Sequence, residues 1–421
     1  MAEIKVPFHR AAITKDEENA VLDVLRSGWL TTGRYALEFE KKFSAAVSDS
    51  ESMKEKRRSM GLPDGEIFSL AVNSNTSGMI LAMEACGVKA GTAVITTPYT
   101  FVSTATCARH LNADVFFADI EKDSYSIDPD KIEEILKKDC QPGGYDGKGS
   151  HRVRAIVPVH IAGNVCNMVR IMELAKKYST PEHKIRVIED AAHSFPSPTE
   201  MGYAGAIGDA GVFSFYVTKT ITTAEGGMVC SRDSELIRRM TVMRMHGMDR
   251  TTWDRYTSPR ASWEYDIIAP GYKFNLPDVL AALGCCQVDR ANLFYEERKA
   301  IVEKYNKAFS KLDFIKLPPD GEGNAWHLYL MRIVPEKLKI SRNEFAKKLQ
   351  EAGLGISVHF IPIFHFTYWQ ELYPDFRAEN FPNAENQYST TISIPLFPDM
   401  TQEQVQLVID TIYKIGTENR R

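Results

Sequence analysis

The chain has 421 residues, 44% of them hydrophobic and 25% charged, an ordinary globular composition. The length predicts two or three domains, or one large domain with a smaller appendage, and needs no disulfide or metal support. Its net charge of −4 argues against a nucleic-acid-binding protein, because phosphate backbones attract basic surfaces. Seven cysteines without CxxC spacing predict reduced thiols and no metal site, and the lack of a signal core or of about 18 consecutive apolar residues predicts a cytoplasmic protein without a membrane segment.

The first 65 residues are expected to form two helices and a loop. Residues 14–28 predict a capped amphipathic helix that ends at Gly28, since glycine often follows the last helical turn. A turn and a second helix are expected over residues 28–47. Residues 48–65 are polar and uneven, so we expect an exposed loop there, with the basic run at 54–58 facing solvent.

From residue 67 onward, short β-branched runs alternate with amphipathic helical segments. We expect strands at 67–74, 92–98, 113–120, 152–163 and 184–193, and helices at 76–87, 101–112, 128–138 and 167–179. This alternation is typical of βαβ units and a mostly parallel sheet. Because such sheets bind ligands at the carboxyl ends of their strands, the polar residues that follow the strands are candidates for a functional site.

The C-terminal part has a different character. After residue 319 the segments 324–334, 341–353, 355–362, 392–400 and 401–415 predict a smaller unit of mixed helices and strands. We place the boundary inside a long charged helix. The sequence therefore predicts a large domain over residues 1–290 and a small α+β domain over residues 291–421.

One strand end is suited to an anion. Residues 73–78 form a small, polar turn that opens a helix, where backbone N–H groups attract negative charge. The hydroxyl groups of Ser74, Thr76 and Ser77 would add donors. A plain helix cap would have the same composition, so this turn alone does not establish a binding site.

Three further strand ends carry aromatic rings, a carboxylate and an amine. Tyr99 and Phe101 would offer a flat face to a planar ring, with a position in the core as the alternative. Asp190 ends a strand and needs a cation or a hydrogen-bond donor, which an ordinary ion pair would also supply. Lys219 follows an apolar strand that carries Ser214. Burial would free its amine to form a Schiff base, although most lysines lie at the surface.

Together these groups meet the requirements of pyridoxal 5′-phosphate. Its aldehyde needs an amine, its phosphate needs donors, and its pyridine nitrogen needs an anion to stay protonated and withdraw electrons. An opposite charge in contact shifts a pKa by about one to three units, enough to keep the ring nitrogen cationic near neutral pH.

The chain resembles the DegT-like (DegT/DnrJ/StrS) sugar aminotransferases, enzymes that depend on pyridoxal phosphate and share the aspartate aminotransferase fold, known as fold type I. The resemblance runs along nearly the whole chain. It rests on several segments taken together: SGWLTTG at 27–33, VNSNTSG at 72–78, TPYTFVSTA at 97–105, IEDAAHS at 188–194, FSFYVTKTITTAEGG at 213–227, GYKFNLPDVLAALG at 271–284 and SVHFIP at 357–362. It implies an α/β large domain with a mostly parallel sheet and a smaller α+β C-terminal domain.

The resemblance also implies an activity: transfer of an amino group, usually from L-glutamate, to a keto group of a nucleotide-linked (deoxy)sugar by a ping-pong mechanism. Lys219 would hold the cofactor in a Schiff base and then move protons as a base. Asp190 would pair with the pyridine nitrogen, and His193 would lie near the ring hydroxyl. Phe101 would stack on the ring, and three residues would bind its phosphate: Thr76, Ser77 and Ser214.

The family forms homodimers with active sites at the subunit interface. Its GYNYR segment lends an asparagine to the partner's phosphate. Here the segment is GYKFN, which puts Lys273 at that place, and a lysine would serve phosphate as a point charge.

Contacts to the sugar nucleotide follow from two matching regions and one loop. Thr31 lies in the first region, at 28–34, and His359 in the second, at 357–360, where it would reach a sugar or phosphate oxygen. A structural histidine is the alternative. Arg250 or Arg255, in a loop over residues 246–260, would meet a diphosphate unless that loop is an ordinary part of the surface.

Three other functions remain as alternatives. Some relatives replace the lysine with histidine and act as dehydratases, and others transfer the amino group to a cyclitol. A sensor that binds a sugar nucleotide without converting it belongs to a different class. Because this chain keeps Lys219, the sequence favours transamination.

Overall fold

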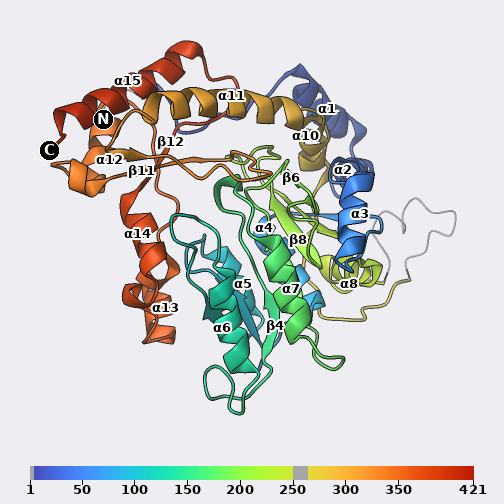
Figure 1. Ribbon diagram of the computed structural model, residues 1–421. Coiled ribbons are helices and arrows are strands. Elements are labelled where there is room, and N and C mark those ends of the chain that lie inside the picture. Colours follow the sequence, from blue (N-terminus) through green and yellow to red (C-terminus); the bar gives the residue numbers. More distant parts are fainter. Residues whose placement is uncertain (1–3, 250–263) are drawn as a thin grey trace.

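The computed structural model describes residues 4–249 and 264–421 and shows an α/β protein built on a central sheet (Figure 1). In this described part, seven strands pair in the order β1-β9-β8-β5-β4-β2-β3. Strand β9 is antiparallel to both of its neighbours, and the pairs from β8 to β3 are parallel. The strands are β1 Phe68–Val72, β2 Ala93–Thr96, β3 Asp114–Phe117, β4 Val153–Ile156, β5 Arg186–Asp190, β8 Ala210–Ser214 and β9 Gly227–Ser231. The predicted α/β fold with a mostly parallel sheet is confirmed.

Helices cover both faces of this sheet. Neighbouring residues on one strand join different cores, with Val212 on one face and Phe213 on the other, as side-chain alternation along a strand requires. One face packs against α4 (Asn75–Ala85), α5 (Ser103–His110) and α8 (Ser234–Arg244). The other packs against α2 (Arg34–Ala46), α6 (Pro129–Asp139), α7 (Met168–Tyr178) and α10 (Asp278–Asp289), with α1 (Lys15–Ser27) outside α10.

Residues 48–65 contain a helix, so the expectation of an exposed loop was wrong. Helix α3 spans Glu51–Ser59 and is capped by the hydroxyl of Ser50. Arg57, in the basic run expected to face solvent, is only 1% exposed. Its guanidinium donates to three backbone carbonyls, those of Pro63, Met201 and Ile207. Two of these acceptors are more than 140 residues away in the chain, so no local pattern could have indicated this burial.

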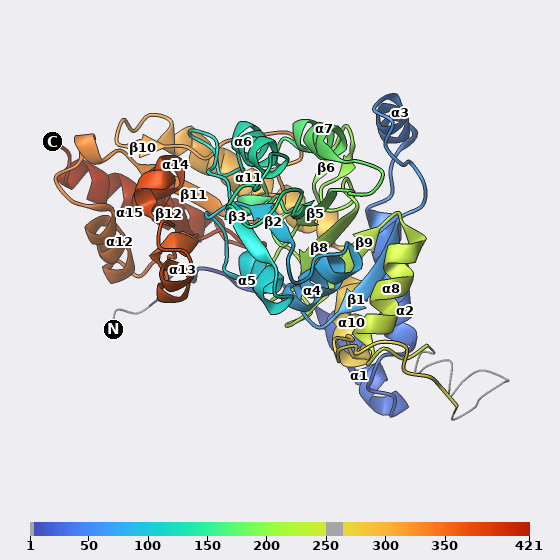
Figure 2. The same cartoon turned by 90° about the horizontal axis from the view of Figure 1, so that it is seen from below.

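The C-terminal part builds a second core. Its antiparallel sheet has the order β10-β11-β12 and packs against helices α11, α12 and α15, with Val6 from the start of the chain in the same core. The elements are α11 Ala291–Phe309, β10 Ile315–Lys316, β11 Tyr329–Ile333, α12 Arg342–Glu351, β12 Thr391–Ile394 and α15 Gln402–Glu418. Helices α12 and α15 lie at one end of the molecule and α1 to α3 at the other (Figures 1 and 2).

Two C-terminal helices belong to the core of the large sheet instead. Helix α13 (Thr367–Leu372) and helix α14 (Pro382–Thr390) pack beside β3, where Trp369 lies edge-on to Phe117 at 5.6 Å between ring centroids. The division of the chain at residues 290 and 291 stays a prediction.

The described helices include none that is both apolar enough and long enough to span a bilayer. All seven cysteines are free, and five of them are buried. Across residues 4–249 and 264–421, no three side chains of the metal-binding types gather as a site for an ion.

Candidate active site

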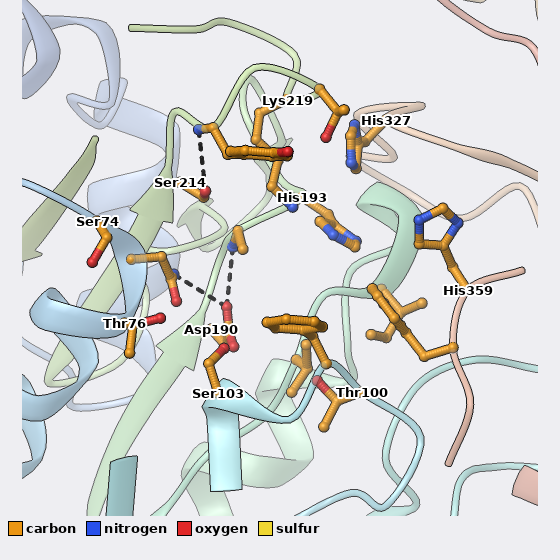
Figure 3. A pocket seen from close by; sticks show the side chains of 18 of the residues that line it. Ser74, Thr76, Thr100, Ser103, Asp190, His193, Ser214, Lys219, His327 and His359 are labelled. Atoms are coloured by element: carbon orange, nitrogen blue, oxygen red, sulfur yellow. Dashed lines mark hydrogen bonds between the residues drawn. The ribbon is translucent and has the colours of Figure 1, made fainter. Parts of the chain in front are cut away.

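A cavity of about 350 Å³ lies at the carboxyl ends of β5 and β8, where the sequence predicts a functional site (Figure 3). The start of α4, the segment before α5, the β8–β9 connection and two C-terminal segments line it. Lys219 and Asp190 face each other across its middle. Hydroxyl groups lie on one side of this pair and imidazoles on the other, as Figure 3 shows.

Lys219 lies in the loop that joins β8 to β9, and the threonines after it hold this loop in place. The hydroxyl of Thr222 and the backbone N–H of Thr223 both donate to the carbonyl of Phe215, each at 3.0 Å. At Gly226 a Cβ would lie 2.3 Å from the hydroxyl oxygen of Thr223, so no larger residue fits without a shift. The loop therefore presents Lys219 from a fixed backbone.

Burial gives the amine of Lys219 unusual chemistry. It lowers the pKa of Lys219 to about 8, against an opposing effect of the negative charge on Asp190. A lysine with this pKa is partly uncharged at neutral pH, and the uncharged amine is the nucleophile and base.

Asp190 is 4% exposed and is held by three donors at the end of β5. Its carboxylate accepts hydrogen bonds from the hydroxyl of Thr104 (2.7 Å), the side-chain amide of Asn75 (3.3 Å) and the backbone N–H of Ala192 (3.2 Å). This fixes the carboxylate in the cavity wall. The sequence did not single out Asn75 or Thr104, although both lie in segments that carry the resemblance.

The start of α4 provides the hydroxyl side of the cavity. Ser74, Thr76 and Ser214 line it, beside the first N–H groups of the helix. Ser77 does not line it. Its hydroxyl pairs with that of Ser74 at 2.9 Å, and its backbone N–H donates to the same Ser74 oxygen at 3.1 Å. At Gly227 a Cβ would lie 2.7 Å from the Ser74 carbonyl carbon, so glycine lets β9 approach this turn.

His193 lies on the opposite side and is neutral. Its Nδ1 accepts the backbone N–H of Ala162 at 3.1 Å, which places the ring proton on Nε2. Burial, and then the charge of Lys219, hold the pKa of His193 well below its usual range.

Two C-terminal histidines complete this side. His359 lines the cavity, with Nδ1 2.8 Å from the hydroxyl of Ser393, and burial followed by the charge of Lys219 lowers its pKa to about 4. His327 was missed by the sequence analysis. It precedes β11, is 3% exposed, and its ring centroid lies 4.4 Å from that of His193. The sequence placed it in the segment 324–334, which we expected to be part of the small C-terminal unit, and no motif there indicated a site residue.

The predicted aromatic pair separates in the structure. Phe101 lines the cavity and is 59% exposed, whereas Tyr99 is fully buried and donates its hydroxyl to the carbonyl of His359. Tyr99 is therefore a core aromatic, the alternative that the sequence left open.

Two further predicted contacts, Thr31 and Lys273, do not line this cavity. Thr31 is exposed between α1 and α2, and Lys273 is exposed and donates to the side-chain oxygen of Asn275 at 2.6 Å. Arg250 and the neighbouring Arg255 lie outside the described residues.

The chain matches one family model over most of its length. The model, described as the DegT/DnrJ/EryC1/StrS aminotransferase family, covers residues 63–413. Among known proteins, the chain is 36% identical over 417 residues to uncharacterized protein MJ1066 of Methanocaldococcus jannaschii, with 99% of this chain and 98% of that protein covered. It is 36% identical over 413 residues to the spore coat polysaccharide biosynthesis protein SpsC of Bacillus subtilis, with 97% of each covered.

Solved structures share the fold along the whole chain. The "Putative sugar aminotransferase Spr1654" from Streptococcus pneumoniae, in its PMP form, is 28% identical with a TM-score of 0.83 and 98% of both chains covered. Helicobacter pylori PseC, an aminotransferase involved in the biosynthesis of pseudoaminic acid, is 25% identical with a TM-score of 0.82, covering 98% of this chain and 99% of that one.

Proposed function

Because the chain belongs to the DegT/DnrJ/EryC1/StrS aminotransferase family, we propose that it uses pyridoxal 5′-phosphate to move an amino group from L-glutamate to a keto group of a nucleotide-linked sugar. The relatives support a sugar as the acceptor, since SpsC is named for polysaccharide biosynthesis and Spr1654 for sugar amination. The observation that carries the proposal is the facing pair of Lys219 and Asp190 in one cavity.

The residues present fit this cofactor. Spr1654 was solved in both a PLP form and a PMP form. In the present chain a partly uncharged amine, a fixed carboxylate and a hydroxyl-lined helix start surround one cavity, as the aldehyde, ring nitrogen and phosphate require. When bound, the cofactor would supply an aldehyde carbon that carries the amino group between substrates and a ring that accepts electrons.

The chain's own side chains would divide the remaining work. The Nζ of Lys219 would take a proton from the reacting carbon of one substrate and return it to the other, because its pKa of about 8 allows both directions near neutral pH. The carboxylate of Asp190 would keep the ring nitrogen of the bound cofactor positively charged. His193 would donate from Nε2 to an oxygen on its side of the cavity, and Ser74, Thr76 and Ser214 would orient the phosphate end.

We also propose a homodimer with shared active sites that works in the cytoplasm. Apolar side chains stand exposed at the cavity, among them Phe101 (59%) and Tyr216 (45%), and a second copy would cover them. Lys273 does not line the cavity of its own subunit. In such a dimer it would reach the cofactor phosphate bound in the other subunit. Seven free thiols are consistent with a reducing compartment.

The decisive experiment separates the two halves of the reaction. Purified protein loaded with the cofactor should convert L-glutamate to 2-oxoglutarate in a single turnover, and the product enzyme should then aminate one member of a panel of keto sugar nucleotides. Borohydride reduction should attach the cofactor to the peptide that contains Lys219, and not to Lys219→Ala. Consumption of the sugar without any need for glutamate would show a dehydratase instead.

Sharing of the site has its own test. Mixing inactive Lys219→Ala chains with Lys273→Ala chains should restore about a quarter of wild-type activity, because half of the re-formed dimers then contain one intact site. No recovery, with exchange of subunits verified by size-exclusion chromatography of tagged chains, would contradict the shared site.

A further inference from the structure

Three imidazoles line the side of the cavity opposite the hydroxyl groups, and we name them the imidazole wall: His193, His327 and His359. The first two rings lie 4.4 Å apart. His193 and His359 each have a partner in the protein, the N–H of Ala162 and the hydroxyl of Ser393. Within residues 4–249 and 264–421, His327 is the member of the wall with no hydrogen-bond partner at either ring nitrogen.

The ring of His327 is buried, but its nitrogens form no hydrogen bond with the described residues. Its Nδ1 is sealed from solvent without a hydrogen-bond partner, and within residues 4–249 and 264–421 no hydrogen bond to its Nε2 is formed either. A sealed lone pair costs less than a sealed N–H. The ring proton therefore belongs on Nε2, which leaves an unused donor in the cavity wall.

The backbone of one residue holds both neighbouring imidazoles. Ala162 adopts a φ of 60°, a left-handed conformation uncommon for a residue with a side chain. Its N–H donates to the ring of His193, and its carbonyl accepts the backbone N–H of His327 at 3.0 Å. Backbone strain of this kind is found at functional sites, where the surrounding structure holds it in place. His327 is thus positioned by the same turn that sets the tautomer of His193.

The charges around His327 favour an anion. Burial is the main cause that holds the pKa of His327 well below its usual range, and His193, Lys219, Arg298 and His359 act in the same direction. The two imidazoles are neutral near neutral pH, so the positive charges nearby are those of Arg298 and of protonated Lys219. Arg298 is 1% exposed and donates to the carbonyl of Thr220, directly behind the lysine loop. None of these four groups is a carboxylate.

The acids that line the cavity lie elsewhere. Asp190 is held by its three donors at the end of β5, and Glu225 is an exposed residue of the β8–β9 loop. A negatively charged ligand group beside His327 would therefore meet donors and positive potential without a competing carboxylate. A sugar hydroxyl would gain little from that potential.

We propose that His327 donates a hydrogen bond from Nε2 to the carboxylate that the amino-acid donor carries beside its reacting amine. This inference rests on the proposed function, in which an amino acid delivers its amine close to Lys219. Its carboxylate is one carbon from the reacting centre and must bind near that lysine, as His327 does. The same contact would not be needed by the keto sugar.

Equilibrium binding of glutarate to the cofactor-loaded protein tests the proposal without any turnover. Glutarate carries the carboxylates of glutamate but no amine, and calorimetry measures its Kd. A hydrogen bond to a charged group is worth about 1.5–3 kcal/mol, so His327→Leu should weaken glutarate about 10- to 100-fold. His327→Gln, whose amide reaches the position of Nε2, should stay within about threefold by the same reasoning.

Two further variants guard against a structural effect. His327→Asn keeps a polar side chain but places its amide at the position of Nδ1, so it should bind glutarate as weakly as His327→Leu. His365→Leu removes an imidazole outside the cavity, one that pairs with Glu385 at 2.7 Å, and should leave the Kd unchanged. In single turnovers, kcat/KM for glutamate should fall with the Kd, while kcat/KM for the keto sugar with the aminated enzyme should not.

The outcomes distinguish this inference from the proposed function. If the wild-type protein neither binds glutarate nor converts glutamate, the proposed amino donor is wrong, and the inference fails with it. If the wild-type protein binds glutarate and both His327→Leu and His327→Asn bind it equally well, only the role of His327 is refuted. An equal loss of kcat/KM for the keto sugar would assign His327 to the sugar instead, which also refutes the proposal.

Discussion

The two sides of the cavity differ in how completely their polar groups are bonded inside the protein. On the side of Asp190, the carboxylate has three donors, and the hydroxyl of Ser74 caps its helix. On the imidazole wall, His327 has no ring partner among the described residues. A carboxylate held by several donors suits one ligand that stays in place, whereas a donor without a partner suits ligands that come and go.

The two sides also differ in where their residues come from. Those around Asp190 belong to the helices and strands of the large sheet, close to the segments that carry the resemblance. The imidazole wall joins His193 to two histidines more than 130 residues further along the chain. The first side is therefore a product of the sheet, and the second depends on how the C-terminal part packs against it.

The largest expected effect comes from removing the amine between the two sides. Lys219→Ala should lower the rate of transamination by about 10⁴-fold or more, because both the nucleophile and the base are lost. Steady-state assays of 2-oxoglutarate formation measure it, with the exposed Lys89→Ala as the control. A loss of less than tenfold would remove Lys219 from the chemistry.

A second buried carboxylate, next to Asp190 on β5, should contribute strongly to the free energy of unfolding. Glu189 is fully buried and accepts from His160 and from the backbone N–H groups of Gly205, Ile207 and Gly208. Glu189→Gln leaves several of these donors without a charged acceptor and should cost about 3–5 kcal/mol of unfolding free energy, measured by urea denaturation of the apoprotein. Glu134→Gln, which loses an exposed ion pair with Lys131 at 2.8 Å, should cost no more than about 1 kcal/mol. Equal losses would mean that burial does not distinguish the two carboxylates.

The pH dependence of the rate at which the apoprotein binds the cofactor should report the effects of burial and of Asp190 on the amine of Lys219. The apoprotein reacts through its uncharged amine, so the capture rate should rise about tenfold per pH unit below a midpoint near 8 and level off above it. Asp190→Asn removes the charge that opposes the effect of burial, so the midpoint should move to lower pH. Stopped-flow absorbance measures both curves. A midpoint near 10.5, the value of an ordinary lysine, would show that burial does not activate this amine.

The smallest of these effects concerns the hydroxyl of Thr104, which donates to Asp190. Thr104→Val removes the 2.7 Å hydrogen bond to Asp190 and should weaken cofactor binding about tenfold or more, since bonds to charged groups contribute about 1.5–3 kcal/mol. Thr106→Val lies two residues further along the same helix and loses only bonds to backbone carbonyls of residues 102 and 103, so its effect should stay within about twofold. Fluorescence titration of the apoprotein gives both affinities, and equal values would rule out a specific role for Thr104.

The sequence by itself determined the sheet and the residues at its strand ends. Short β-branched runs between helices dictate a parallel arrangement, and in that arrangement Asp190 and Lys219 must reach the same edge, because parallel strands all end there. The positions of Thr76 and Ser214 follow from the same rule, since each lies directly at a strand or helix end.

Only the tertiary structure decided the groups that depend on distant partners. Arg57 is buried because carbonyls from residues 201 and 207 surround it, which its polar neighbours in the sequence do not reveal. His327 faces His193 because Ala162 accepts its backbone N–H. The spacing of apolar residues in the sequence indicates the local backbone conformation and which face of a helix or strand is buried. Contacts between residues more than 100 positions apart depend on how the helices and strands pack in the folded chain.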